Sequence, residues 1–313
     1  MELIRGLCNL RPRHRGCVAT IGNFDGVHLG HQAVLGQLAE KAAELDLPSV
    51  VITFEPYPQE FFAQSAVPPR LTRFREKIQA LRRFSVDRVL CLPFNRTLSE
   101  TNAQDFIRRI LVEGLGVRYL VVGDDFRFGH QRQGDFAMLK EAGARYGFQV
   151  VNRHTFSIDG ARVSSTRIRE ALAHGDLNTA GKLLGRPYRM CGRVAHGDQR
   201  GRTIGFPTAN IYLHRKASPV QGVFAVEMFG LDAEPLPGVA NVGTRPTVDG
   251  TRALLEIHLL DFAQDIYGRY VQVDFLHKLR DEQKFASLDE LKRQIEFDAV
   301  QARGFFDNKI ELI

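Results

Sequence analysis

The first half of the chain alternates short, almost wholly apolar runs with longer amphipathic segments. The apolar runs span 17–22, 49–54, 87–92, 118–123 and 147–152, and the amphipathic segments span 31–45, 72–84, 103–115 and 134–147. Such runs are typical of buried parallel strands, and the segments between them have helical spacing. The alternation predicts an α/β fold, a doubly wound parallel sheet with helices on both faces. Ligands of such folds bind beyond the carboxyl ends of the strands.

The pattern changes at about residue 188. Strand-like segments follow one another at 188–197, 222–230, 237–243, 253–262 and 270–279, and a helical pattern returns only at 287–306, with Ser287 and Glu290 as a capping box. This order predicts a small antiparallel β-barrel followed by a C-terminal helix. We therefore expect two domains, 1–185 and 186–313, with short helices at 164–175 and 177–185 next to the boundary.

Length and composition limit the classes of function. A chain of 313 residues is too long for one ordinary core, and no apolar stretch reaches the roughly 20 residues that span a bilayer. The four cysteines are scattered and the N-terminus lacks the apolar core of a signal peptide, so a cytoplasmic protein is expected. The net charge of +6 comes from the first half. Such a basic half could bind nucleic acid or, equally, a polyphosphate substrate, but its basic residues are dispersed, as on an ordinary solvated surface. Neither a nucleic-acid nor a membrane partner is predicted.

The sequence GNFDGVHLGH follows the first apolar run and leads into a helix. Gly22 and Gly26 allow a sharp turn and a close approach to a ligand. His28 and His31 are three residues apart, so both rings project to one side of a helical turn, beside free backbone N–H groups. This arrangement predicts a phosphate site. Asp25 fits a turn-forming residue better than a catalytic one.

GNFDGVHLGH resembles the HxGH signature of nucleotidyltransferases, and SSTRIR at 164–169 resembles the second element of that family. The resemblance implies a Rossmann-like domain in which His28, His31 and Arg169 act on the triphosphate of ATP. An acceptor that is already a phosphate anion needs no general base, which agrees with this set of residues. The other implied nucleotide-binding residues are Gly22, Asn23, Phe24, Asp25, Gly26, Ser164, Ser165 and Thr166.

The loop at 121–129 lies at the expected ligand edge of the sheet and resembles the flavin-side loop of bacterial FAD synthetases. Its two phenylalanines are either core residues or rings that stack on a planar ligand. The resemblance implies flavin contacts by Gly123, Asp125, Phe126 and Phe128. Many members of that family have His at the position of Tyr57, so no essential role is assigned to Tyr57.

A second candidate site lies in the glycine-rich stretch 192–211, which ends in PTAN. Thr208 and Asn210 are two apart on a strand and face the same way, with oxygen ligands that suit Mg²⁺ on nucleotide phosphates. A kinase for an alcohol also needs a base. Strand spacing places both Glu256 and His258 on one face and leaves both as candidates for it.

The segments GRTIGFPTANI, NVGTRPT, LEIHLLDF and RDEQKF resemble the bacterial riboflavin kinase module. The resemblance implies that Glu256 is the base, that Thr208 and Asn210 bind Mg²⁺ and nucleotide, and that Gly197, Gly201 and Arg202 contact the nucleotide. For Arg245 and Arg280, a phosphate or flavin contact and a structural ion pair are both open.

Together the two signatures resemble the bacterial bifunctional riboflavin kinase/FMN adenylyltransferases over nearly the whole chain. That family implies phosphorylation of riboflavin to FMN by ATP, then adenylylation of FMN to FAD with release of pyrophosphate. Two alternatives remain: an enzyme with only one of the activities, and a nucleic-acid module that uses the basic first half. The oligomeric state is left open, a homo-oligomer included.

Overall fold

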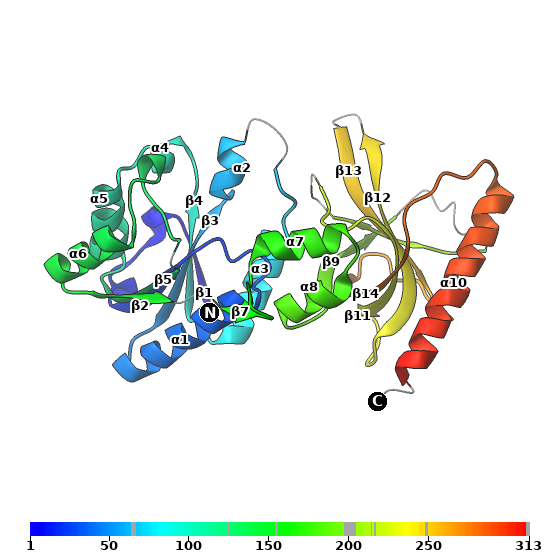
Figure 1. Ribbon diagram of the computed structural model, residues 1–313, viewed down its shortest axis with the longest axis horizontal. Coiled ribbons are helices and arrows are strands. Elements are labelled where there is room, and N and C mark those ends of the chain that lie inside the picture. Colours follow the sequence, from blue (N-terminus) through cyan, green and yellow to red (C-terminus); the bar gives the residue numbers. More distant parts are fainter. Residues whose placement is uncertain are drawn as a thin grey trace. The chain divides into compact units, whose positions relative to one another are not determined.

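The computed structural model describes residues 1–63, 67–123, 125–153, 156–196, 205–213, 215, 217–247 and 250–310. The chain forms two compact units, shown as ribbons in Figure 1. Unit 1 consists of Met1–Val67 and Lys77–Ser164, and unit 2 consists of Pro68–Glu76 and Ser165–Ile313. The short segment Pro68–Glu76 thus belongs by its contacts to the C-terminal unit, although it lies early in the sequence.

Unit 1 is built on a six-stranded sheet in the order β1-β4-β3-β2-β5-β6. Every neighbouring pair of its strands is parallel. The strands are β1 (Glu2–Arg5), β2 (Cys17–Ile21), β3 (Ser49–Glu55), β4 (Arg88–Pro93), β5 (Val117–Gly123) and β6 (Gln149–Arg153). The order reverses at β2, since β3 lies on one side of it and β5 on the other, and such switch points are where ligands bind. The predicted doubly wound sheet is confirmed, and β1 is an additional edge strand that the pattern did not show.

Helices cover both faces of this sheet. On one face α1 (Leu29–Leu45) packs against β2, β3 and β5. On the other face a hydrophobic core joins the strands to α5 (Ala103–Phe106), a π-helical continuation at Ile107–Gly114, and α6 (Phe136–Tyr146). The predicted helix 103–115 is therefore α-helical only at its start, and the bond from Leu115 N to Ile110 O has the i→i−5 spacing of a π-helix. The shorter elements are α2 (Pro58–Phe62), α3 (Phe74–Leu81), α4 (Arg96–Ser99), β7 (Ser157–Ile158) and β8 (Ala161–Arg162).

Unit 2 contains a closed antiparallel barrel in the order β10-β13-β12-β11-β14-β9. Its strands are β9 (Tyr188–Ala195), β10 (Ala209–Tyr212), β11 (Gly222–Phe229), β12 (Leu236–Thr247), β13 (Gly250–Leu259) and β14 (Tyr270–Arg280). Phe224, Ile257 and Phe275 are almost wholly buried, as expected for side chains that fill the interior of a small barrel. The predicted barrel is confirmed.

The C-terminal helix α10 (Leu288–Ile310) packs on the outer face of the barrel. Val223, Ala225 and Val239 form a hydrophobic cluster there with Ala299 and Ala302. The predicted Ser287 cap is present, because Glu290 N donates to Ser287 Oγ at 3.2 Å. The Glu290 carboxylate accepts from Ala286 N at 3.0 Å, one residue before the cap, and not from Ser287 N as a capping box requires. The two short helices α7 (Ser165–Ala173) and α8 (Leu177–Leu184) belong by their contacts to unit 2.

Candidate active sites

The turn that follows β2 places the two histidines at the start of α1. Phe24 and Val27 have positive φ angles of 50° and 43°, and Gly26 has 84°, so the backbone reverses tightly there. His28 is the N-cap of α1, and its Nδ1 accepts a hydrogen bond from His31 N at 3.3 Å. The two rings stack with their centroids 3.7 Å apart and an angle of 16° between planes. The structure thus brings both imidazoles together at a helix N-terminus, as the spacing predicts.

His31 is held in its neutral form. Burial lowers its pKa well below the ordinary value, and the charges of His28 and Lys77 lower it further. Its Nδ1 is buried and has no hydrogen-bond partner among the described residues. A neutral imidazole offers one donor and one acceptor, so His31 can hydrogen-bond a phosphate group without a proton having to be removed first.

Lys77 is a residue of this site that the sequence analysis missed. It lies on α3 and its side chain is fully buried. Its Nζ donates to Asn23 O at 3.1 Å and to Thr53 Oγ1 at 2.9 Å, and it lies 4.7 Å from the ring centre of Tyr57. Helical spacing could have indicated that Lys77 is buried, because it lies one turn before Leu81 on the apolar side of α3.

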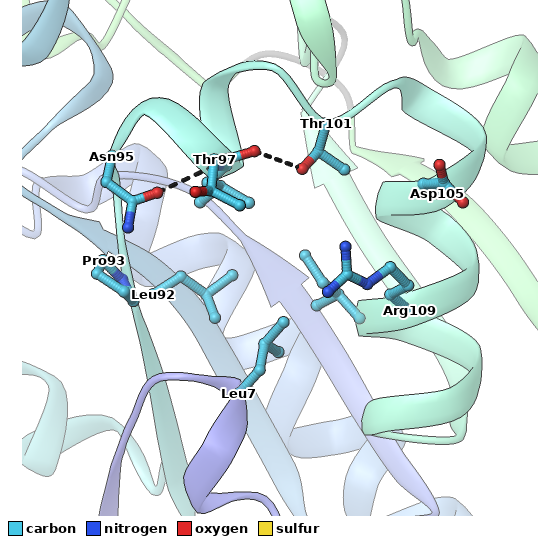
Figure 2. Close-up of a pocket in the computed structure, with 10 residues that line it drawn as sticks. Leu7, Leu92, Pro93, Asn95, Thr97, Thr101, Asp105 and Arg109 are labelled. Atoms are coloured by element: carbon cyan, nitrogen blue, oxygen red, sulfur yellow. Dashed lines mark hydrogen bonds between the residues drawn. The ribbon is translucent and has the colours of Figure 1, made fainter.

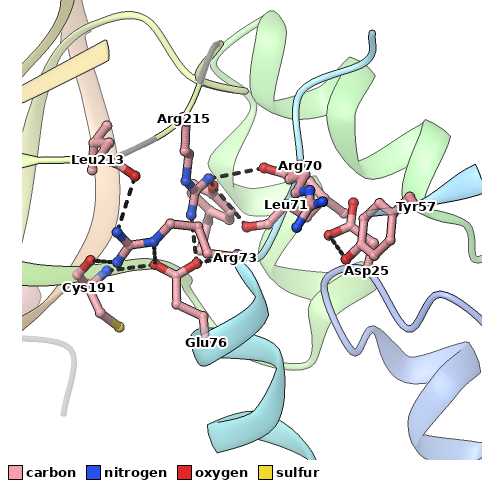
Figure 3. A network of polar contacts seen from close by, with 10 residues as sticks. Asp25, Tyr57, Arg70, Leu71, Arg73, Glu76, Cys191, Leu213 and Arg215 are labelled. Atoms are coloured by element: carbon pink, nitrogen blue, oxygen red, sulfur yellow. Dashed lines mark hydrogen bonds and ion pairs between the residues drawn. The ribbon is translucent and has the colours of Figure 1, made fainter. Parts of the chain in front are cut away.

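Tyr57 also belongs to this cluster. Tyr57 is 5% exposed and its hydroxyl donates to Asp25 Oδ1 at 3.4 Å. Figure 3 shows the two side chains facing each other. Asp25 is itself buried in the turn after β2. The structure therefore gives Tyr57 a structural place beside the histidine turn, where the sequence analysis assigned it none.

The second element of the nucleotidyltransferase signature forms the start of α7 in unit 2. Ser165 and Thr166 are its first two residues, with Ser164 just before them. Arg169 Nε donates to Pro69 O at 2.7 Å. This bond orients the guanidinium through one of its nitrogens. A nucleotide contact by Ser164, Ser165, Thr166 and Arg169 stays a prediction.

The proposed flavin loop is packed more tightly than an open stacking platform. Phe128 is 6% exposed, and its ring stacks on Phe126 with centroids 5.5 Å apart and lies 5.3 Å from Phe106. Asp125 forms an ion pair with Arg162 at 2.9 Å. Phe128 is thus a core residue in this structure. The flavin contacts of Gly123, Asp125, Phe126 and Phe128 stay predictions.

A pocket of 210 Å³ opens in unit 1 beside the carboxyl end of β4 (Figure 2). Five of its lining residues are apolar and make a hydrophobic wall: Leu7, Leu92, Pro93, Leu98 and Ile110. Arg109 extends its guanidinium into the pocket from the π-helical segment, and Thr97 lies across from it. The pocket joins a hydrophobic wall to a positive charge at the ligand-bearing edge of the sheet. No motif in the sequence analysis pointed to it.

The barrel brings Glu256 between two asparagines. Strand pairing places Asn210 of β10 directly opposite Glu256 of β13, and Asn241 of β12 opposite it on the other side. Asn241 lies two residues after Val239, which packs against α10, so all three polar side chains project from the outer face of the barrel. Asn210 is 6% exposed. Asn241 Oδ1 is buried and has no hydrogen-bond partner in the described parts of the chain.

The sequence left two roles open for His258 and for Arg280, and the contacts of both side chains favour a structural one. The ring of His258 hydrogen-bonds Pro207 O at 3.0 Å and contacts Phe206 edge-on, contacts that give it a structural role. Arg280 forms an ion pair with Asp298 of α10 at 2.7 Å, which is the structural ion pair that the sequence left as one of two alternatives for Arg280. Gly197, Gly201, Arg202 and the side chain of Arg245 lie outside the described residues.

Comparison with known protein families matches residues 10–167 to FAD synthetase and residues 184–306 to riboflavin kinase. The bifunctional riboflavin kinase/FMN adenylyltransferase of Escherichia coli (strain K12) is 55% identical over 98% of both chains. The chain belongs to this bifunctional family. The enzyme of the same name from Haemophilus influenzae is 53% identical over 98% of this chain and all of its own. The two family matches confirm the predicted enzyme, which converts riboflavin to FMN and FMN to FAD at the expense of ATP.

A crystal structure described as a macrolide-efflux protein from Streptococcus pneumoniae has a TM-score of 0.82 and 32% identity over 97% of this chain. This likeness supports the two-part fold. Among the described residues, none of the helices combines the length and the apolar character needed to cross a membrane.

Proposed function

We propose that the two reactions of the family are divided between the parts of the chain, with adenylyl transfer in 1–185 and riboflavin phosphorylation in 186–313. The observation that carries this division is that the histidine pair lies in unit 1 and the Asn210–Glu256–Asn241 row lies in unit 2. The two groups also have different chemistry. One centres on a pair of imidazoles at a helix N-terminus, and the other centres on a carboxylate.

In adenylyl transfer, the phosphate of FMN attacks the α-phosphate of ATP and pyrophosphate leaves. The acceptor is already an anion, so this step needs hydrogen-bond donors and a positive field rather than a base. His28 and His31 at the N-terminus of α1 supply donors, and the helix dipole adds positive potential. Arg169 stabilises the leaving pyrophosphate in this proposal.

The flavin ring of FMN has an apolar face and polar edges. The pocket beside β4 offers matching groups, with Leu92 and Ile110 in its wall and Arg109 and Thr97 at its polar side. Ile110 lies one helical turn after Phe106, which packs against Phe128 of the loop that the sequence analysis selected. We therefore place the flavin ring in this pocket, next to that loop.

In the kinase reaction, Glu256 accepts the proton of the terminal ribityl hydroxyl while that oxygen attacks the γ-phosphate of ATP. Asn210 and Thr208 provide an amide oxygen and a hydroxyl, which suit Mg²⁺ together with substrate phosphates. The unpartnered oxygen of Asn241 is a hydrogen-bond acceptor opposite Glu256. When bound, Mg²⁺ neutralises phosphate charge. The absence of a second carboxylate in this row of three leaves Glu256 available as the base.

The purified chain with riboflavin, ATP and Mg²⁺ tests the division. His28→Ala combined with His31→Ala should abolish FAD formation and leave FMN formation intact. Glu256→Gln should abolish FMN formation from riboflavin and leave FAD formation from added FMN intact. If either variant were folded and had lost both steps, the proposed division would be wrong.

All four cysteines are free and three of them are buried. Free thiols persist in a reducing compartment, which supports our proposal that the enzyme works in the cytoplasm.

A further inference from the structure

The ammonium group of Lys77 is enclosed in unit 1, with none of its side chain exposed to solvent. Burial of a charged ammonium is unfavourable unless other groups of the protein pair with it and accept its hydrogen bonds. In this structure two of its contacts are hydrogen bonds to oxygen and one is a cation–π contact with Tyr57.

The three contacts come from three different segments. Asn23 lies in the turn after β2, Thr53 lies near the end of β3, and Tyr57 begins α2. The Thr53 hydroxyl also donates to Asn23 O at 3.4 Å, so the same carbonyl oxygen accepts from both Thr53 and Lys77. One ammonium therefore ties the turn to the carboxyl end of β3.

That turn carries the histidine pair. Gly22 and Gly26 bracket Asn23, and His28 follows two residues later as the cap of α1. A shift of the Asn23 carbonyl would move the backbone that orients both rings. The positive charge is also close enough to His31 to oppose its protonation, together with His28. Asp25, in the same turn, is occupied by its contact with Tyr57.

We propose that Lys77 is a positioning residue for adenylyl transfer, which fixes the turn of the histidine pair through the Asn23 carbonyl and adds the charge of its ammonium group to the surroundings of His31. This inference rests on the proposed role of His28 and His31. Lys77 acts through the turn and does not touch the substrate.

A lysine with only a structural role would affect folding and leave the kinetics of the folded enzyme unchanged. Three substitutions separate this structural role from a positioning role in adenylyl transfer. Lys77→Met keeps the volume and removes both the charge and the hydrogen bonds. Lys77→Gln removes the charge and keeps an amide N–H donor, on a side chain that is one bond shorter. Thr53→Val removes one hydrogen-bond partner and keeps the charge. Lys41→Met is the matched control, because Lys41 also lies over an aromatic ring, that of Tyr119 at 5.0 Å, but reaches the surface.

The experiment measures kcat and KM for FAD formation from FMN and ATP in the full chain, with FMN formation from riboflavin as an internal control. For Lys77→Met we expect kcat for FAD formation to fall about 100-fold with a smaller change in KM, as for a reacting group displaced by about 1 Å. FMN formation should stay within about twofold, since its proposed residues lie in the other unit. Lys41→Met should change neither reaction.

The second readout is the pKa of the His31 imidazole, followed by NMR. It should rise in Lys77→Met and in Lys77→Gln and stay unchanged in Thr53→Val. A folded Lys77→Met that kept FAD formation within about threefold of the unaltered chain would overturn the proposal. So would an unchanged His31 titration. If neither Lys77→Met nor Lys77→Gln folds, Tyr57→Leu is measured instead, because it removes the ring that the Lys77 ammonium contacts. An unchanged kcat for FAD formation in Tyr57→Leu would then overturn the proposal.

Failure of the underlying function gives a different result. If the double histidine variant still made FAD, the roles of His28 and His31 would be wrong whatever Lys77→Met did. If the double variant were inactive and Lys77→Met fully active, only the inference about Lys77 would fail.

Discussion

Asn241 on β12 lies directly opposite Glu256 on β13, and its side-chain oxygen is buried without a hydrogen-bond donor among the described residues. Directly opposite residues in antiparallel strands have Cβ atoms about 4.5–5.5 Å apart, so the amide can reach the carboxyl group. Ionised Glu256 has no proton to donate, but once it has accepted one from the ribityl hydroxyl it can donate to Asn241 Oδ1. The unpartnered oxygen is therefore suited to the state of the site that forms during phosphoryl transfer.

Asn241→Ala should lower kcat for FMN formation by about 10-fold, a part of the ~10²–10⁴-fold that a positioned base supplies. The thermal midpoint should not fall, because the substitution removes a buried acceptor that lacks a donor. FAD formation from added FMN is the internal control. A loss of stability with unchanged FMN formation would show that Asn241 serves packing alone.

Asn241→Asp tests the same pair through its pH dependence. A second carboxylate opposite Glu256 disfavours the ionised form and should raise the pKa of the base. The acidic limb of the pH–rate profile for FMN formation should then move to higher pH. An unshifted limb would mean that the two side chains do not interact.

Unit 2 holds a buried ion pair between Glu76 and Arg215, with Oε2 and Nη2 2.7 Å apart (Figure 3). Glu76 also accepts a hydrogen bond from Cys191 N at 3.1 Å and pairs with Arg73, so it ties the segment Pro68–Glu76 to the barrel. Arg215→Leu leaves part of a buried charge uncompensated and should cost about 3 kcal/mol of unfolding free energy, measured with urea. Arg96→Ala breaks a fully exposed pair with Glu100 and should change nothing measurable. Equal effects of the two would contradict this account.

Unit 1 should lose stability in mild acid. The pKa of His31 is lowered by burial and by neighbouring charges, so the unfolded chain binds a proton at higher pH than the folded chain does. The free energy of unfolding therefore carries no penalty from His31 above its ordinary pKa of 6.5. It decreases as the pH falls from 6.5 toward the lower pKa that His31 has in the folded protein. Thermal midpoints between pH 7.5 and about 5 should show this decline, and it should be weaker in His31→Gln, which cannot titrate. An identical decline in the variant would assign it to other groups.

The four thiols should differ in reactivity. Cys8 is exposed, whereas burial raises the pKa of Cys17 to about 12 and that of Cys191 to about 11. Because the thiolate is the reactive form, a disulfide reagent at pH 8 should modify one thiol rapidly in the folded protein and all four in denaturant. Cys8→Ser should remove the rapid phase. Rapid modification that persisted in this variant would show that a buried thiol is accessible.

Local patterns in the sequence were enough for most of the architecture. Apolar runs and helical spacing predicted β2 to β6, the main helices and the barrel, because each signal lies within one element. The short strand β1 has charged residues, Glu2 and Arg5, at both ends and only two apolar residues between them, too few to show a period. The histidine turn was also predictable, since His28 and His31 are neighbours on a single helical turn.

Only the tertiary structure decided which distant residues share a site. The burial of Lys77 depends on how α3 packs against Asn23, Thr53 and Tyr57, which the spacing within α3 does not define. The row of Asn210, Glu256 and Asn241 depends on the register of three strands, and a shift of one residue would turn Asn241 to the opposite face. The sequence by itself thus determined the two folds, the family and most candidate residues. Strand register and helix packing, which arise from long-range contacts, decided the partners of those residues.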